Sequence, residues 1–239
     1  MKIELIVPLL ILTAITICII GSITIAHEFE YAIFSAYILC YMAIIPIIFT
    51  KYKKYPLLYI VAFSVGLVFE VIGVHTGIPF GSYEYVMLGP FRVLDVPISI
   101  PIMWGIYSML TYLTARTWFK GWKLVVYASI LMVIIDLVLD PLMTSWKAWI
   151  WKGGWGPTIY GIPLSNYIGW FIVSLTIMTI YEQIIKGDAP RITVMPLIYL
   201  YEVAFYSMYA PKDIALITMI LAYSSIIAPT LYSMQKQYS

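Results

Sequence analysis

The sequence predicts an all-α protein: a polytopic bundle of about eight transmembrane helices that forms a single integral membrane domain over residues 1–239. Composition is the first observation, because 62% of the residues are apolar and only 11% are charged, whereas soluble domains average about a quarter charged. The second is that apolar runs long enough to cross a bilayer, about 20 residues each, recur along the whole chain. A soluble protein of this size could not hide so many runs in one core.

The apolar runs place the expected helices in order along the chain. The first run follows Lys2, as in a signal peptide, but it is too long for a signal-peptide core and lacks a small-residue cleavage site, so we expect it to be the first helix. The predicted helices cover roughly residues 4–26, 31–50, 57–75, 95–115, 123–143, 164–185, 192–210 and 213–232.

Lysine and arginine indicate the orientation of these helices. With a cytoplasmic N-terminus and eight helices, ten of the 14 basic residues fall on the cytoplasmic side, as the positive-inside rule expects. With one helix more or fewer, the later loops would change sides and this bias would be smaller. We therefore expect both termini to be cytoplasmic in a multi-pass protein of the cell membrane. The net charge of +2 gives no indication of a nucleic-acid partner.

Two loops on the predicted outer side, residues 76–94 and 144–163, are longer than ordinary connections in a bundle. Long, patterned loops are often functional. The second loop carries tryptophans at positions 146, 149, 151 and 155. The pattern favours an aromatic belt at the lipid headgroups, with contact to a substrate as the alternative.

Carboxyl side chains within the predicted helices are the strongest functional signal, because ionisable groups are costly in a membrane. Glu70, Asp136 and Asp140 lie deep in helices that run outward, Asp95 is expected to open the fourth helix from the outer side, and Glu202 lies near the middle of the seventh. All five are therefore expected in the outer half of the bilayer.

Asp136 and Asp140 are spaced i, i+4, which puts them on one helix face. Two carboxyls that close in a low dielectric cannot both ionise easily, so one is expected to stay protonated beside an ionised partner. Asp140 precedes Pro141, where the helix should kink or end. The structural alternative is that the acids pair with Arg92 or His75 and only hold helices together.

Other chemistries have little support in the sequence. The two histidines, His27 and His75, form neither an HxxxH nor a Glu-x-x-His pattern, no lysine lies in mid-helix for a retinal Schiff base, and no Gly-rich phosphate loop occurs. We therefore expect no metal and no cofactor. Acid–base chemistry on a hydrophobic molecule remains, and the many aromatic side chains could stabilise a carbocation.

Four motifs resemble one known family: FGSYEY at 80–85, VPISIPIMW at 96–104, DLVLDP at 136–141 and YGIPLSNYIGWF at 160–171. They are similar to the membrane carotenoid-biosynthesis proteins of the bisanhydrobacterioruberin hydratase and γ-carotene 1′,2′-hydratase type. The resemblance covers a core of about 66–171 and little of the first two and last two helices. The family often has a small residue where this chain has Asp95.

The resemblance implies a hydratase that protonates the terminal double bond of an acyclic carotenoid and captures water, with the carotenoid and the bilayer as partners. Asp140 would donate the proton, Asp136 would tune it, Glu70 would act as base or counter-charge, and Asp95 would be a further catalytic candidate. Asn166 and Tyr83 would place the water. The candidates for binding substrate or water are Asn166, Tyr83, Glu84, Trp104, Tyr160, Trp170 and His75.

Two rival interpretations stay open. A small membrane lycopene cyclase would begin with the same protonation, but such cyclases carry a Pro-x-Glu-Glu motif where this chain reads Pro163-Leu164-Ser165-Asn166. A transporter or carotenoid-binding protein without chemistry would also use acids within helices. The outward displacement of the acids argues against the transporter.

Overall fold

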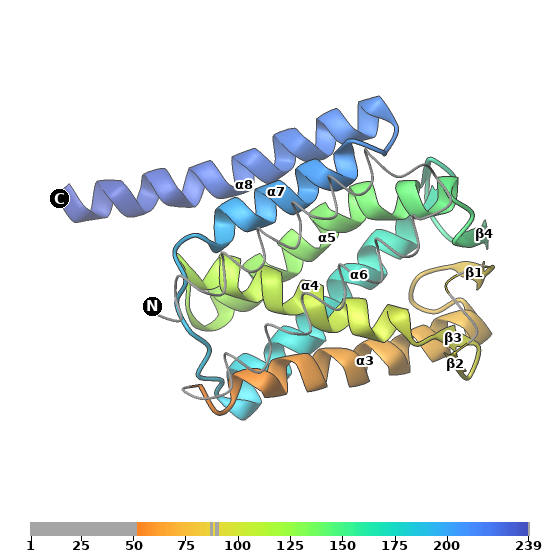
Figure 1. Ribbon diagram of the computed structural model, residues 1–239, viewed down its shortest axis with the longest axis horizontal. Coiled ribbons are helices and arrows are strands. Elements are labelled where there is room, and N and C mark those ends of the chain that lie inside the picture. Colours follow the sequence, from red (N-terminus) through yellow and green to blue (C-terminus); the bar gives the residue numbers. More distant parts are fainter. Residues whose placement is uncertain (1–51, 87, 89–90, 239) are drawn as a thin grey trace, which may run out of the picture.

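The computed structural model describes residues 52–86, 88 and 91–238, and shows an antiparallel bundle of helices (Figure 1). The two helices predicted at 4–26 and 31–50 lie outside the described residues. The helices of the described part are α3 (Tyr55–Thr76), α4 (Ser99–Arg116), α5 (Gly121–Ser145), α6 (Leu164–Thr179), the π-helix η2 (Ile180–Ile185), α7 (Met195–Ser207) and α8 (Lys212–Tyr238).

These helices lie where the apolar runs predict them, with two local differences. The predicted helix 164–185 is α6 continued by the π-helix η2. The predicted helix 95–115 begins at Ser99 instead, because the short strands β2 (Arg92–Val93) and β3 (Val96–Pro97) form a tight antiparallel turn before it. Asp95 lies in that turn with φ +69, so the prediction that it opens the helix is wrong.

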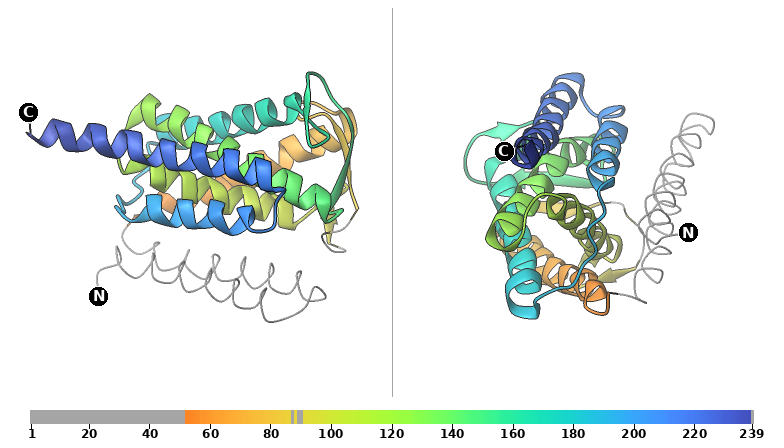
Figure 2. Two further views of the ribbon diagram at one scale, coloured as in Figure 1. Left: turned by 90° about the horizontal axis from the view of Figure 1, so that it is seen from above. Right: turned by 90° about the vertical axis from the view of Figure 1, so that its left-hand side faces the viewer.

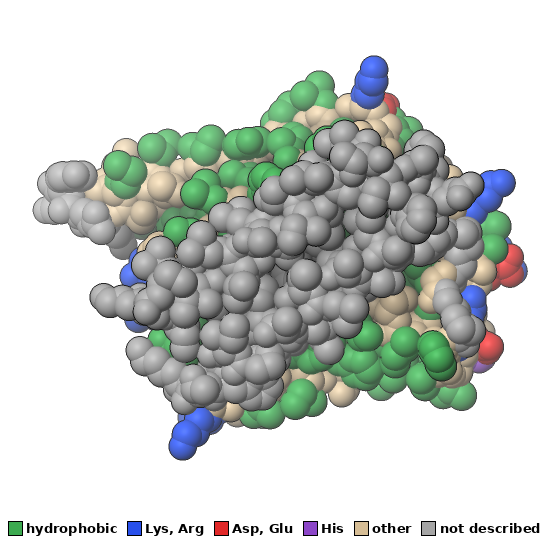
Figure 3. Space-filling model, in the orientation of Figure 1, with side chains coloured by type: hydrophobic (Ala, Val, Ile, Leu, Met, Phe, Trp, Pro, Cys, Tyr) green, Lys and Arg blue, Asp and Glu red, His purple; other side chains and the backbone are tan. Residues whose placement is uncertain are grey.

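Four helices of the described region are long and apolar enough to cross a membrane: α3, α5, α6 together with η2, and α8. They indicate an integral membrane protein. α4 is not among them because its sequence is less apolar: it includes Ser108, Thr111 and Thr114, which are buried in the bundle. Figure 3 shows charged side chains toward the two ends of the molecule and hydrophobic ones between them. The total of eight helices and the cytoplasmic termini stay predictions.

The strands gather at one end of the bundle, and α8 extends beyond the bundle at the opposite end (Figures 1 and 2). At the strand end the two long loops meet, since β1 (Ser82–Tyr85) pairs antiparallel with β4 (Trp149–Gly153). The short strands β5 (Thr158–Ile159) and β6 (Ile162–Pro163) form a further hairpin that leads into α6. We call the β1–β4 pair the cap.

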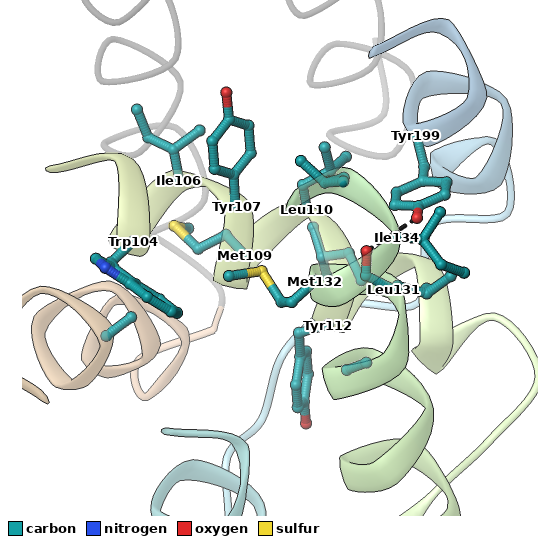
Figure 4. Close-up of a cluster of buried hydrophobic side chains, with 14 of the residues drawn as sticks. Trp104, Ile106, Tyr107, Met109, Leu110, Tyr112, Leu131, Met132, Ile134 and Tyr199 are labelled. Carbon is teal, nitrogen blue, oxygen red and sulfur yellow. Dashed lines mark hydrogen bonds between the residues drawn. The ribbon is translucent and has the colours of Figure 1, made fainter. Parts of the chain in front are cut away.

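The core is centred on α4, which packs against α3, α5 and α7. Large buried side chains from α4 and α5, including Trp104, Tyr107 and Tyr112, fill the space between these helices (Figure 4). Gly66 of α3 lets α4 approach closely, because a Cβ at this position would lie 2.6 Å from Trp104 Cγ. Small residues at helix contacts are common in membrane bundles for this reason.

Candidate active site

The cap turns four aromatic side chains toward the end of the bundle. Tyr83 pairs with Trp151 and Tyr85 with Trp149 in the strand register, and side chains alternate between the two faces of a strand. These four are therefore on one face and are buried or partly buried, whereas Glu84 and its neighbours on the other face are exposed.

Glu70 of α3 is a buried carboxyl held by three neutral donors. The hydroxyls of Tyr83 and Tyr85 each donate to Glu70 Oε2 over 2.6 Å. The indole nitrogen of Trp104, from α4, donates to Glu70 Oε1 over 2.8 Å. Each carboxylate oxygen thus has a partner, which offsets part of the cost of burying it.

Asp140 of α5 is held in the same way by the other strand of the cap. The indole nitrogens of Trp149 and Trp151 donate to Asp140 Oδ1 over 2.7 and 3.0 Å. Thr144 Oγ1 lies 3.4 Å from the same oxygen. This contact exists because α5 continues as a helix past Pro141 to Ser145, rather than ending at the proline.

Asn166, at the start of α6, joins the two aspartates. Its side-chain nitrogen donates to Asp136 Oδ2 over 2.8 Å and to Asp140 Oδ2 over 2.6 Å. All three side chains are buried. The i, i+4 spacing therefore does place both carboxyls on one face, and a single amide nitrogen holds them close together.

A cavity lies under the cap and is bounded by both acids. It offers about 60 Å³ of space to the centre of a water molecule. Its polar lining includes Glu70, Asp140 and Asn166, and Asp136 lies behind Asn166 rather than in the wall. The apolar lining is mostly aromatic: Phe80, Tyr83, Tyr85, Trp104, Tyr107, Trp149, Trp151 and Trp170, with Leu88, Ile100, Met103, Leu139 and Met143.

The electrostatics of this cavity favour a positive charge. Among the described residues that line it, two are acids and none is lysine, arginine or histidine. Burial raises the pKa of Tyr83 and Tyr85 well above the ordinary value, and the Glu70 carboxylate adds to the rise. Both hydroxyls therefore remain donors. Trp104 and Trp170 stack with ring centroids 4.4 Å apart, and aromatic faces attract cations.

Comparison with known proteins places the chain in a family. The model of the carotenoid biosynthesis protein family matches residues 28–235. The chain belongs to this family. The bisanhydrobacterioruberin hydratase of Haloarcula japonica is 29% identical over 119 residues, which is 47% of this chain and 40% of that protein. The match thus spans less than half of the relative's length. No solved structure matches the chain significantly.

Several residues predicted as site members lie elsewhere in this carotenoid biosynthesis protein. Glu84 is on the outer face of the cap, paired with Lys152 over 2.6 Å. Asp95 and His75 are exposed and lie 3.4 Å apart. Tyr160 is exposed and hydrogen-bonds Asp213 at the start of α8. The structure brings none of these four to the cavity.

Four residues around the cavity were not among the predicted site members: Tyr85, Thr144, and Trp149 and Trp151, for which substrate contact was only the alternative to an aromatic belt. The aromatic-belt interpretation is wrong for Trp149 and Trp151, which point their indole nitrogens at Asp140, although Trp155 is exposed. A signal was present. Tyr83-Glu84-Tyr85 alternates aromatic and charged residues with a period of two, as a strand with one buried face does, whereas Trp149-Ile150-Trp151 is apolar throughout.

Proposed function

We propose that this protein is a carotenoid hydratase that adds water across the terminal double bond of an acyclic carotenoid end group, without a cofactor. One observation carries the proposal. The cavity is lined mainly by aromatic side chains, its two carboxyls accept hydrogen bonds from neutral donors, and none of its described lining residues is basic. Such a cavity suits an intermediate that is a tertiary carbocation. Membership of the family and the similarity to a hydratase support the same reaction.

The substrate would enter only by its end. The cavity has several times the space that one water needs, about 10–15 Å³ by the same measure, but a whole carotenoid could not fit into it. The polyene chain would stay in the bilayer, in keeping with the many apolar side chains on the outer surface of the helices. The excess of basic residues on the predicted cytoplasmic side supports a position of the cap in the outer half of the membrane.

The aspartate pair would supply the proton. Asp136 and Asp140 share Asn166 and would share one proton, because two adjacent buried carboxylates repel each other. Asp140 lines the cavity, so it would protonate the alkene carbon that bears a hydrogen. The electron pair of the π bond forms the new C–H bond, which leaves the positive charge on the carbon that bears two methyl groups.

Glu70, which also lines the cavity, would complete the reaction. Its carboxylate, fixed by three donors, would stabilise the cation and then take a proton from the water that attacks it. Tyr83 and Asn166 would hold this water. The product is a tertiary alcohol. One water is consumed per end group and no other co-reactant, and the cycle closes when the proton on Glu70 returns to the aspartate pair.

Expression in a host that accumulates lycopene or bisanhydrobacterioruberin tests the proposal, with pigments analysed by chromatography and mass spectrometry. We expect a product heavier by one water per modified end. Asp140→Asn should lower its amount at least about 100-fold, because general acid–base groups contribute 10²–10⁴-fold. Glu84→Gln, the same kind of change on the outer face of the cap, is the matched control and should retain the product.

Two outcomes would count against a hydratase. A product of unchanged mass with cyclic end groups would identify a cyclase, in which an internal double bond captures the cation. Unaltered pigment with folded wild-type protein, across several acyclic carotenoids, would instead favour a transporter or a carotenoid-binding protein.

A further inference from the structure

A buried acid outside the cavity has no part in the reaction described so far. Glu202 of α7 is fully buried and does not line the cavity. It hydrogen-bonds Tyr206, which follows it by four residues and thus lies on the same face of α7. A carboxyl in this position is costly in a membrane bundle, so its contacts are informative.

Tyr206 continues the contact toward the cavity. Its hydroxyl hydrogen-bonds the hydroxyl of Tyr107 on α4, and the two rings meet edge to face with centroids 6.3 Å apart. Tyr107 is fully buried and lines the cavity. In Figure 4 it leaves α4 in a different direction from Trp104, whose nitrogen holds Glu70. A chain of two hydrogen bonds therefore connects Glu202 with the cavity wall.

The acceptor at the end of this chain can fix its geometry. A phenol hydroxyl can both donate and accept, so two facing phenols alone leave the direction of their hydrogen bond undefined. When Glu202 accepts from Tyr206, the Tyr206 oxygen is left to accept from Tyr107. Hydrogen bonds in such a chain strengthen one another in a low dielectric. The Tyr107 ring is then held in one orientation against the cavity.

We propose that Glu202 is a positioning residue which, through Tyr206, holds the ring of Tyr107 as the part of the cavity wall that faces the cation. This inference rests on the proposed hydratase activity. A fixed aromatic face stabilises a nearby cation more than one that moves, because the attraction depends on the position of the charge over the ring. Glu202 itself touches neither substrate nor water.

A double-mutant cycle tests this role against a purely structural one. The variants are Glu202→Leu, Glu202→Gln, Tyr206→Phe and Tyr107→Phe, alone and in pairs, with turnover and KM measured on acyclic carotenoid in membranes. We expect Glu202→Leu and Tyr206→Phe each to lower turnover about tenfold with little change in KM. In the Tyr107→Phe background, Glu202→Leu should cause no further loss, because the chain is already broken.

Two controls separate positioning from folding. Glu202→Gln keeps an acceptor oxygen and should recover most of the turnover that Glu202→Leu loses. Tyr199→Phe makes the same change as Tyr206→Phe on the same helix, where the buried hydroxyl donates to the Leu131 carbonyl over 2.9 Å, and it should leave turnover unchanged. Thermal unfolding of each variant reports the structural contribution of each side chain.

The inference is wrong if Glu202→Leu lowers turnover by the same factor with and without the Tyr107 hydroxyl, or if Glu202→Gln falls as far as Glu202→Leu. If the wild-type protein hydrates carotenoid, either result would overturn the role of Glu202 but not the proposed hydratase function. A wild-type protein that makes no hydrated pigment would overturn the proposed function before any variant is compared.

Discussion

The two ends of the bundle use acidic side chains in different ways. At the strand end, Glu70 and Asp140 accept hydrogen bonds from tyrosine, tryptophan, threonine and asparagine side chains around a cavity. At the opposite end, Glu182 of η2 accepts from the Tyr112 hydroxyl and from the backbone N–H of Gly121, over 3.0 Å for the latter. Glu182 therefore satisfies a backbone donor at the start of α5.

Basic side chains at that opposite end serve the backbone as well. Lys54 Nζ donates to the carbonyls of Ile185 and Lys186 over 2.9 and 3.3 Å, and Arg191 donates to the carbonyl of Thr117 over 2.8 and 3.2 Å. Helix ends leave such groups without partners inside the helix. At this end, charged side chains hydrogen-bond backbone groups at the ends of helices, whereas the acids under the cap line or adjoin a cavity. This contrast supports placing the proposed function at the strand end.

The largest expected effect comes from making one substitution at both ends. Glu70→Gln should lower hydrated product at least about 100-fold, because it removes the base and the counter-charge of the cation. Glu182→Gln should leave product per folded protein within about twofold while lowering the unfolding temperature by a few degrees, since it weakens a link between helix ends. Pigment analysis and thermal unfolding of both purified variants measure this. An equal loss of product at both ends would remove the distinction.

The next effect concerns the donors of Asp140. Trp149→Phe and Trp151→Phe keep an aromatic ring but remove an indole N–H each. These N–H groups would stabilise the carboxylate that Asp140 becomes when it gives up its proton, and a hydrogen bond to a charged group contributes about 1.5–3 kcal/mol. We expect each change to lower the initial rate about tenfold and the double variant to lose more. The exposed Trp155 provides the control, since Trp155→Phe should have no effect on the rate. Unchanged rates in the double variant would show that Asp140 does not depend on the cap.

The sequence predicts the bundle well, because each helix is a local pattern of apolar residues. Depth counted along each helix also predicts that Glu70, Asp136 and Asp140 lie at one end of the bundle, whereas Asn166 was predicted only from the family resemblance. The cap is different. β1 and β4 are separated by two helices, so the sequence of neither strand identifies its partner. Alternation in Tyr83-Glu84-Tyr85 indicates a buried and an exposed face, but it does not say that the buried face lies over Glu70. Asp95 was misplaced because a turn of positive φ is not visible in an apolar pattern.

A smaller effect is expected from close packing at the two ends. A Cβ on Gly66 would lie 2.6 Å from Trp104, and one on Gly187 would lie 2.2 Å from Tyr181. Overpacking costs about 1–3 kcal/mol, so Gly66→Ala and Gly187→Ala should both unfold at a lower temperature. Gly66→Ala should also lower product per folded protein a few-fold, because it displaces the tryptophan that holds Glu70. Equal product from both variants would show that the Trp104 contact is dispensable.

The smallest effect is expected on the outer face of the cap. Glu84 and Lys152 pair over 2.6 Å, but both side chains are about half exposed, and exposed ion pairs contribute about 0–1 kcal/mol. Lys152→Met should therefore shift the unfolding temperature by less than about 3 °C and leave the amount of hydrated pigment unchanged. Thermal unfolding at low and high salt should give a small difference that decreases at high salt, because salt screens the pair. A loss of product as large as that of Trp151→Phe, one position away on the inner face, would mean that both faces of the cap act on the substrate, and the function could no longer be assigned to the inner face alone.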